Sequence, residues 1–346
     1  MNSLERVALT LQHKEADRIP VYPIINSVSR KTMGLSYETW TRDVDKCAEA
    51  IIRATDELDL DIMCSLVDLS VEAADWGQEI LYSADNAACP NDANRLIKGV
   101  EDYGKIGPID PRKTPRMSEH IELCRKMVEA RGSEKAVVAF VFAPLGVASM
   151  LRGQAEFFMD MITHPDAVKA CVGQINETLK EYCTALAETG VHAIMLDTLF
   201  ASQSIMSEAM WDEFEGPFVE ELADHIHSLG PMVMLHNCGN GSYFRNQIER
   251  MKPTAISFLH VPSDCSTYEE MAEKYGRDVT LIGHLDPGWL VGATEEEIDE
   301  ECRVQIERYK AGGGFILATG CEYPSVLGLD KARVIVEAAK KYGSYR

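Results

Sequence analysis

The sequence predicts a closed (β/α)8 barrel, on three observations. Short apolar runs rich in β-branched residues alternate with amphipathic helical stretches, which is the pattern of a parallel sheet with crossover helices. Eight such runs occur, and polar or Gly/Pro-rich sequence follows each of them, as the loops of a barrel require. We therefore expect residues 1–346 to form a single barrel domain, with strands at residues 18–25, 58–66, 136–142, 192–196, 232–235, 255–258, 279–283 and 315–318.

The helices between these strands have recognisable faces and ends. Apolar residues from Val44 to Ile52 follow helical spacing, so residues 41–57 are predicted to form a core-facing helix. Pro165 opens a long helix, which Gly190 ends. Two capping boxes predict further helix starts, one formed by Ser266 with Glu269 and one by Thr294 with Glu297.

One long segment interrupts the alternation of strands and helices. Residues 68–116 contain several Pro, Asn and Asp residues and lie between the second and third predicted strands. A loop of this length in a compact domain is usually functional or locally structured. We interpret it as an insertion over the barrel mouth.

Composition excludes several classes of protein. The chain has 34 basic and 55 acidic residues, a net charge of −21, which disfavours binding to nucleic acid. The longest nearly apolar run, residues 136–151, is broken by Pro144 and Gly146 and is too short to span a membrane. The first twenty residues contain no apolar segment of the kind that a signal peptide has, and the ten cysteines form no CxxC pair. These features predict a cytoplasmic protein without a nucleic-acid or membrane partner.

The fifth and eighth predicted strands end in metal-binding residue types. The fifth runs directly into His236 and Cys238, whose spacing places both side chains on one face of an extended segment. The eighth ends at Cys321, which a closed barrel brings to the far side of the same mouth. One imidazole and two thiolates neutralise Zn²⁺ and leave a fourth position for water or substrate, as in catalytic zinc sites. The alternative is that each of the three residues is buried for its own packing reason.

Other polar residues fall at the ends of predicted strands. Asp197, His260 and His284 follow the fourth, sixth and seventh strands, and Glu322 follows Cys321. Each can hold a substrate, supply the fourth metal ligand or only brace a loop, and the sequence does not choose among these roles. As working hypotheses, we assign catalysis to His284 and Asp197 and substrate binding to His260 and Glu322. Signatures of a phosphate loop, a Rossmann site, a nucleophile elbow and HExxH are absent.

The chain resembles the uroporphyrinogen decarboxylase superfamily over nearly its full length. The resemblance is carried by co-linear blocks: ERVALTLQHKEADRIPV, FAPLGVASMLRGQAEFFMDMITHPD, GVHAIMLDTLFASQSIMSEAMWDEFEGPF, LHNCGNG, GHLDP and ATGCEYP. It implies a single (β/α)8 barrel, in agreement with the strand count.

Within that superfamily the sequence looks like the zinc-dependent corrinoid methyltransferases. His236, Cys238 and Cys321 match the zinc motif of that branch. The decarboxylase's Arg-rich segment RQAGRY, which grips porphyrinogen carboxylates, is replaced here by IINSVSRKTMGL, which argues against decarboxylation of an octa-acid. The family's GNLDP appears as GHLDP, so His284 is a departure that marks substrate choice or an extra metal contact. The chain has no DxHxxG cobalamin motif, so the resemblance implies that a separate corrinoid-binding protein carries the cobalamin.

These implications define the expected function. Cob(I)alamin is a strong nucleophile, but a methyl ether has a poor leaving group, so zinc on the departing oxygen lowers the barrier. We expect a methyltransferase that demethylates a small methylated donor such as a methyl ether, with His284 as a candidate proton donor near neutral pH. Three alternatives stay open: a thiol methyltransferase that accepts methyl from the corrinoid protein, a metal-free decarboxylase, and a barrel that only binds a tetrapyrrole.

Overall fold

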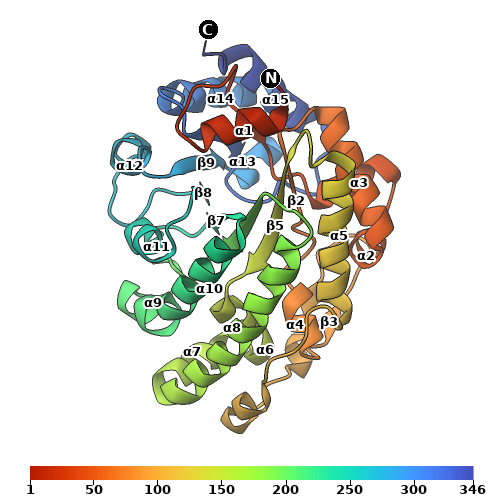
Figure 1. The fold of residues 1–346 in the computed structure, drawn as a ribbon, viewed down its shortest axis with the longest axis vertical. Coiled ribbons are helices and arrows are strands. Elements are labelled where there is room, and N and C mark those ends of the chain that lie inside the picture. Colours follow the sequence, from red (N-terminus) through yellow and green to blue (C-terminus); the bar gives the residue numbers. More distant parts are fainter. Residues whose placement is uncertain (346) are drawn as a thin grey trace.

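Eight parallel strands form the central sheet of the computed structural model, which describes residues 1–345 (Figure 1). Hydrogen-bonded neighbours run in the order β1, β10, β9, β8, β7, β6, β5, β2. The sheet curls into a nearly closed TIM-type barrel, as the sequence predicts. The barrel strands are β1 (Val21–Tyr22), β2 (Ile62–Cys64), β5 (Ala136–Phe142), β6 (Ala193–Asp197), β7 (Met232–Asn237), β8 (Ala255–Phe258), β9 (Thr280–Leu285) and β10 (Phe315–Thr319).

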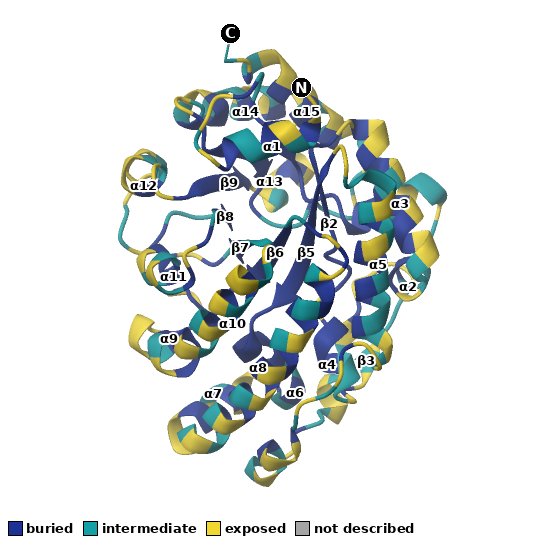
Figure 2. Cartoon of the chain, viewed as in Figure 1, coloured by how far each residue is buried: buried dark blue, intermediate teal, exposed yellow. Residues whose placement is uncertain are grey.

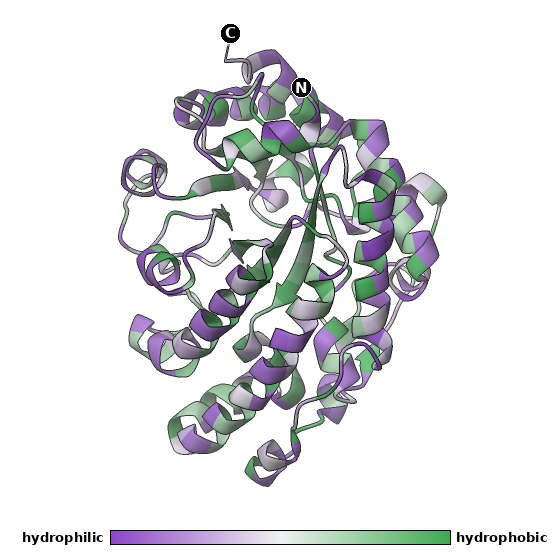
Figure 3. Ribbon diagram, viewed as in Figure 1, coloured by the Kyte–Doolittle hydropathy of each residue, from purple (hydrophilic) through white to green (hydrophobic). Residues whose placement is uncertain are grey.

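Helices surround the sheet and turn their polar faces outward. The strands are buried, whereas the helices alternate buried and exposed residues, and hydropathy follows the same division (Figures 2 and 3). The helices are α1 (Ser3–Thr10), α2 (Tyr37–Arg42), α3 (Val44–Leu58), α4 (Val71–Asp75), α5 (Pro115–Arg131), α6 (Pro144–Arg152), α7 (Gln154–Thr163), α8 (Pro165–Ala187), α9 (Glu208–Phe214), α10 (Gly216–Leu229), α11 (Phe244–Met251), α12 (Tyr268–Tyr275), α13 (Pro287–Gly292), α14 (Glu295–Tyr309) and α15 (Asp330–Tyr342). Within residues 1–345, none of these helices has both the length and the apolar character of a membrane span.

Most predicted boundaries agree with the structure. The strands predicted at residues 136–142 and 255–258 are β5 and β8. The first strand is far shorter than predicted, because Pro20 and Pro23 flank Val21–Tyr22 and lack the N–H groups that would extend the ladder. The capping box at Thr294 is present, whereas α12 begins one residue later than predicted, with Thr267 accepting from the Glu270 amide.

The segment between β2 and β5 is locally structured. Besides α4 it contains the two-stranded sheet of β3 (Ile80–Leu81) and β4 (Cys89–Pro90) and the 3-10 helices η2 (Asp92–Asn94) and η3 (Val100–Lys105). The Asp75 carboxylate accepts hydrogen bonds from the first backbone amides of α5, and the Tyr103 hydroxyl donates to Asp160 of α7. These bonds fasten the segment to the helices beside the barrel. That residues 68–116 cover the barrel mouth stays a prediction.

The gap between β1 and β2 is closed by one residue, Asp61, instead of a strand ladder. The Asp61 amide donates to the Val21 carbonyl, and the Asp61 carboxylate accepts from the Val21 amide at 2.8 Å. The same carboxylate, fully buried, is paired with Arg6 of α1 at 2.7 Å and Arg18 at 2.8 Å. Two arginines therefore compensate the negative charge of Asp61 at the point where β1 and β2 close the barrel.

We expect Asp61→Asn to destabilise the fold by about 3 kcal/mol, because Arg18 loses its carboxylate partner and Arg6 keeps only Asp17. The free energy of unfolding in urea measures this loss. Glu38→Gln is the control, since its pair with Arg42 is exposed on one helix and contributes roughly 0.5 kcal/mol or less. A loss no larger than the control's would show that the seam does not depend on this charge.

Candidate metal centre

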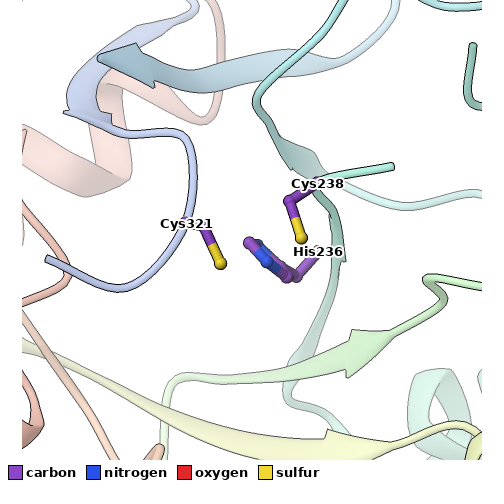
Figure 4. A group of neighbouring side chains, drawn as sticks. All are labelled: His236, Cys238 and Cys321. Carbon is purple, nitrogen blue, oxygen red and sulfur yellow. The ribbon is translucent and has the colours of Figure 1, made fainter. Parts of the chain in front are cut away.

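His236, Cys238 and Cys321 lie together at the carboxyl end of the barrel. Their donor atoms are all within 4.8 Å of one another, and their side chains point toward a common position (Figure 4). His236 is on β7, Cys238 directly follows β7, and Cys321 follows β10. The structure thus brings together the three residues that the sequence predicts as metal ligands.

The turn after β7 is fixed by Asn237 and Gly239. The buried Asn237 amide group donates to the carbonyls of Thr198 and Ala201, while its oxygen accepts from the Gly239 amide. A Cβ atom at Gly239 would stand 2.4 Å from the Ser202 hydroxyl oxygen, so only glycine permits this close approach. These contacts hold Cys238 in place between two fixed neighbours.

Cys321 is held in a similar way at the end of β10. The Gly320 amide donates to the Leu285 carbonyl, and a Cβ atom at Gly320 would lie 2.7 Å from the Cα of Leu259. On the other side, Glu322 accepts a hydrogen bond from the Ser27 amide at 2.8 Å. The backbone that carries the thiol is therefore anchored on both sides.

The His236 ring has a defined orientation. Its Nδ1 lies 3.0 Å from the hydroxyl oxygen of Ser257 on the neighbouring strand β8. With Nδ1 next to Ser257, Nε2 is the ring nitrogen left to serve the cluster with Cys238 and Cys321. The Phe140 ring lies 5.9 Å from the imidazole, centre to centre. Burial lowers the pKa of His236, but the hydrogen bond and negative charge of Cys321 outweigh it and raise the pKa above 6.5.

The pKa values of the two thiols are shifted in opposite directions. A hydrogen bond from Cys238 and the neighbouring His236 lower the pKa of Cys321 well below its usual value of 9, although burial opposes the shift. The same thiol pair raises the pKa of Cys238, and burial adds to the effect. One sulfur of the pair is therefore ready to act as a thiolate ligand or nucleophile at neutral pH.

This donor set fits zinc. Sulfur ligands about 2.3 Å from a tetrahedral ion are about 3.8 Å apart, so donors within 4.8 Å need only small movements to bind one. No fourth His, Cys, Asp or Glu joins the cluster in residues 1–345. The protein's own donors thus leave one tetrahedral position open.

Asp197 and Glu322 border the cluster. Asp197 pairs with His236 in the β6–β7 register, and its Oδ1 accepts from the Leu199 amide. Burial, together with the negative charge of Cys321, raises the pKa of Asp197 to about 6. Burial and the same charge raise the pKa of Glu322 to about 7. Both carboxyl groups can therefore exchange a proton near neutral pH beside the thiols.

His284 is not one of the three clustered residues, and its catalytic role stays a prediction. Its ring stacks on Tyr268 of α12 at 3.8 Å and meets Tyr309 of α14 edge-on. It thus lies in the layer between strand β9 and the outer helices, where burial lowers its pKa to about 3. His260 lies close enough to His284 to contribute to the lowering of its pKa. His260 is likewise not one of the three clustered residues.

Sequence reasoning missed Ser257 and Phe140, which contact the His236 ring. Both lie within runs interpreted only as apolar strands. A polar residue in the middle of the buried strand AISF is the signal that points to Ser257. Phe140 gives no comparable signal, because aromatic residues are common in buried strands.

Comparisons with known proteins agree with this architecture. The family model described as Uroporphyrinogen decarboxylase (URO-D) matches residues 2–342. A solved methyltransferase from Methanosarcina mazei superposes with a TM-score of 0.84 and 20% identity, covering 99% of both chains. That likeness shows the fold.

Two curated relatives match parts of the chain. Uroporphyrinogen decarboxylase 2, chloroplastic, of Arabidopsis thaliana is 22% identical over 182 residues, which are 50% of this chain and 44% of that protein. A methylated-thiol–coenzyme M methyltransferase of Methanosarcina mazei is 26% identical over 206 residues, 59% of this chain and 53% of that protein. The chain thus spans about half the length of these relatives.

The thiol acidities predict selective alkylation of the metal-free protein. Cys321 is expected to react with iodoacetamide at a nearly constant rate from pH 6 to pH 9, because its thiol is already ionised. Cys265 is also partly exposed, but burial and Asp264 raise its pKa to about 11, so its rate is expected to rise about tenfold per pH unit. Mass spectrometry of peptides measures both rates. Equal pH profiles at the two sites would contradict the assignment of Cys321 as the thiolate.

Proposed function

The chain belongs to the uroporphyrinogen decarboxylase family, and on that basis we propose that it is a zinc-dependent methyltransferase of a corrinoid system. Its substrates are a small methylated compound, best matched by a methyl ether, and the cobalt of a cobalamin carried by a separate protein. The methyl group passes from the ether oxygen to cobalt(I), and the oxygen leaves with a proton as the alcohol or phenol.

The cluster of His236, Cys238 and Cys321 is the observation that carries this proposal. Two thiols and one imidazole converge from β7 and β10 at the barrel end where enzymes of this fold have their active sites. With three protein donors and an open fourth position, the set is of the catalytic type. A metal-free decarboxylase gives no reason for these three donors to meet.

The residues of the chain have separate roles in this scheme. His236, Cys238 and Cys321 hold the ion, which when bound supplies a Lewis acid for the leaving oxygen or for a thiol substrate. Asp197 and Glu322 are the proton-carrying groups beside it, with pKa values of about 6 and 7. Glu322 uses Oε1 for the Ser27 amide, so Oε2 is the atom that delivers the proton.

A thiol substrate is the main alternative within the same chemistry. It is favoured by the name of one curated relative, a methylated-thiol–coenzyme M methyltransferase. The ligand set serves both directions of methyl transfer, so substrate screening decides between them.

The segment after β1 favours methyl transfer over decarboxylation of a porphyrinogen. Its two basic residues are Arg30 and Lys31, and the Lys31 ammonium donates to the carbonyls of Val326 and Leu327. One of the two cations is thus already engaged by the protein, which leaves little charge to bind a substrate with many carboxylates.

The corrinoid protein is proposed to dock on the carboxyl-terminal rim. Exposed apolar side chains occur on segments that follow β2, β9 and β10: Leu69, Leu81, Trp289, Val291 and Val326. Leu69 and Leu81 belong to the insertion of residues 68–116. Apolar groups suit this contact, because a net charge of −21 gives no attraction toward an acidic partner.

We expect the purified protein to bind about one zinc ion per chain. Replacing His236, Cys238 or Cys321 by Ala is expected to abolish stoichiometric binding, since two or fewer donors hold the ion poorly. Elemental analysis after dialysis measures the content. Cys183→Ser is the control, because this buried thiol lies on α8, and its loss leaves the donor set intact. Protein purified without chelator that contains no metal contradicts the mechanism.

Methyl transfer is tested with free cob(I)alamin and a panel of phenyl methyl ethers, methanol, methylamines and methylated thiols. The visible spectrum of cobalt is expected to change with an ether, and the zinc-ligand variants are expected to lose at least about 10²-fold in rate. If the zinc-loaded protein reacts only with methylated thiols, the thiol alternative is the correct assignment. Zinc-loaded protein that is inert toward the whole panel contradicts the proposed activity.

A further inference from the structure

Ser257 holds a position that the proposed activity does not use. It lies on β8 directly beside His236 in the β7–β8 register, so both side chains stand on the same face of the sheet. Its side chain has no exposure to solvent, and only 4% of His236 is exposed. The distance from Ser257 Oγ to His236 Nδ1 is 3.0 Å. The contact between these two atoms is therefore largely shielded from solvent.

The chemistry of a metal-binding imidazole determines which atom donates the hydrogen bond in this contact. A neutral imidazole has one N–H donor and one lone pair, and a metal binds the lone pair. Nδ1 lies against Ser257, so Nε2 is the nitrogen left for the metal, and the proton then sits on Nδ1. In that tautomer Nδ1–H donates, and the Ser257 hydroxyl oxygen 3.0 Å away is positioned to accept.

The same contact selects one of two ring orientations. A half-turn of the imidazole about its Cβ–Cγ bond would exchange Nδ1 with a carbon atom and bring a C–H group to Ser257. That orientation loses the hydrogen bond and leaves Nδ1 buried without a partner, which is unfavourable. Phe140, 5.9 Å from the imidazole, further limits the space for this rotation.

We propose that Ser257 is the positioning residue of the metal centre: its hydroxyl accepts the Nδ1–H of His236 and thereby fixes Nε2 as the ligand atom. This inference rests on the proposed zinc site and names the neighbour that orients its only imidazole. Partners of this kind change metal affinity when they are removed, typically by 10- to 100-fold.

The first test compares zinc affinity across four proteins by chelator competition. Ser257→Ala is expected to weaken binding by roughly 10- to 100-fold, and Ser257→Thr, which keeps the hydroxyl, to restore most of it. Thr280→Val is the matched control: it removes a buried strand hydroxyl that donates to the Thr10 carbonyl and is expected to leave affinity unchanged. Ser257→Ala with wild-type affinity, in a folded protein, overturns the inference.

The second test reads the tautomer in the wild-type protein and does not depend on any variant at Ser257. In the zinc-loaded, ¹⁵N-labelled protein, the His236 signals, assigned by their loss in His236→Asn, are expected to show a slowly exchanging proton on Nδ1. A proton on Nε2 overturns the inference. Wild-type protein that binds no zinc contradicts both this inference and the proposed function. Tight zinc binding with the expected tautomer but no methyl transfer contradicts the proposed function alone.

Discussion

Closure of the strand ring is the constraint on which the rest of the structure depends. Because β1 and β2 have no ladder between them, the ring closes through Asp61, which bonds to Val21 through both its backbone and its side chain. Arg6 and Arg18 compensate its charge, so a fully buried carboxylate can occupy the seam. Only in a closed ring do the ends of β7 and β10, separated by β8 and β9, point at one position. The cluster of His236, Cys238 and Cys321 thus depends on closure of the ring as much as on the three residues themselves.

The features that sequence reasoning predicted are those tied to the ends of strands. His236, Cys238 and Cys321 lie where apolar runs give way to Gly-rich turns, and a barrel collects such ends at one face. Their convergence follows from this rule without any knowledge of distances. The short length of β1 was not predicted, because the apolar pattern continues through Pro20 and Pro23, where the hydrogen-bond ladder cannot.

The features that were not predicted are those that depend on which face of a strand a side chain occupies. Parallel strands are buried on both faces, so their sequences lack the alternation that separates inside from outside. All six residues of β9 are buried, and nothing in TLIGHL reveals that His284 points to the helices. The same ambiguity hid Ser257, which β8 directs toward His236. The face on which a side chain lies is set by the register of its strand against the neighbouring strands, and only the assembled barrel defines that register.

The juxtaposition of Cys238 and Cys321 also has a redox consequence. The isolated buried thiol of Cys171 has a pKa raised by burial to about 12 and is inert, whereas the pKa of Cys321 is lowered and its sulfur lies beside that of Cys238. A thiolate of this kind is oxidised by peroxide to a sulfenic acid, which the neighbouring thiol then converts to a disulfide with loss of water. Zinc bound at the proposed site would occupy the same sulfur lone pairs and would block that reaction. If the proposed zinc ion binds here, metal and oxidant compete for one pair of sulfur atoms, so loss of the ion and oxidation of the thiols are coupled.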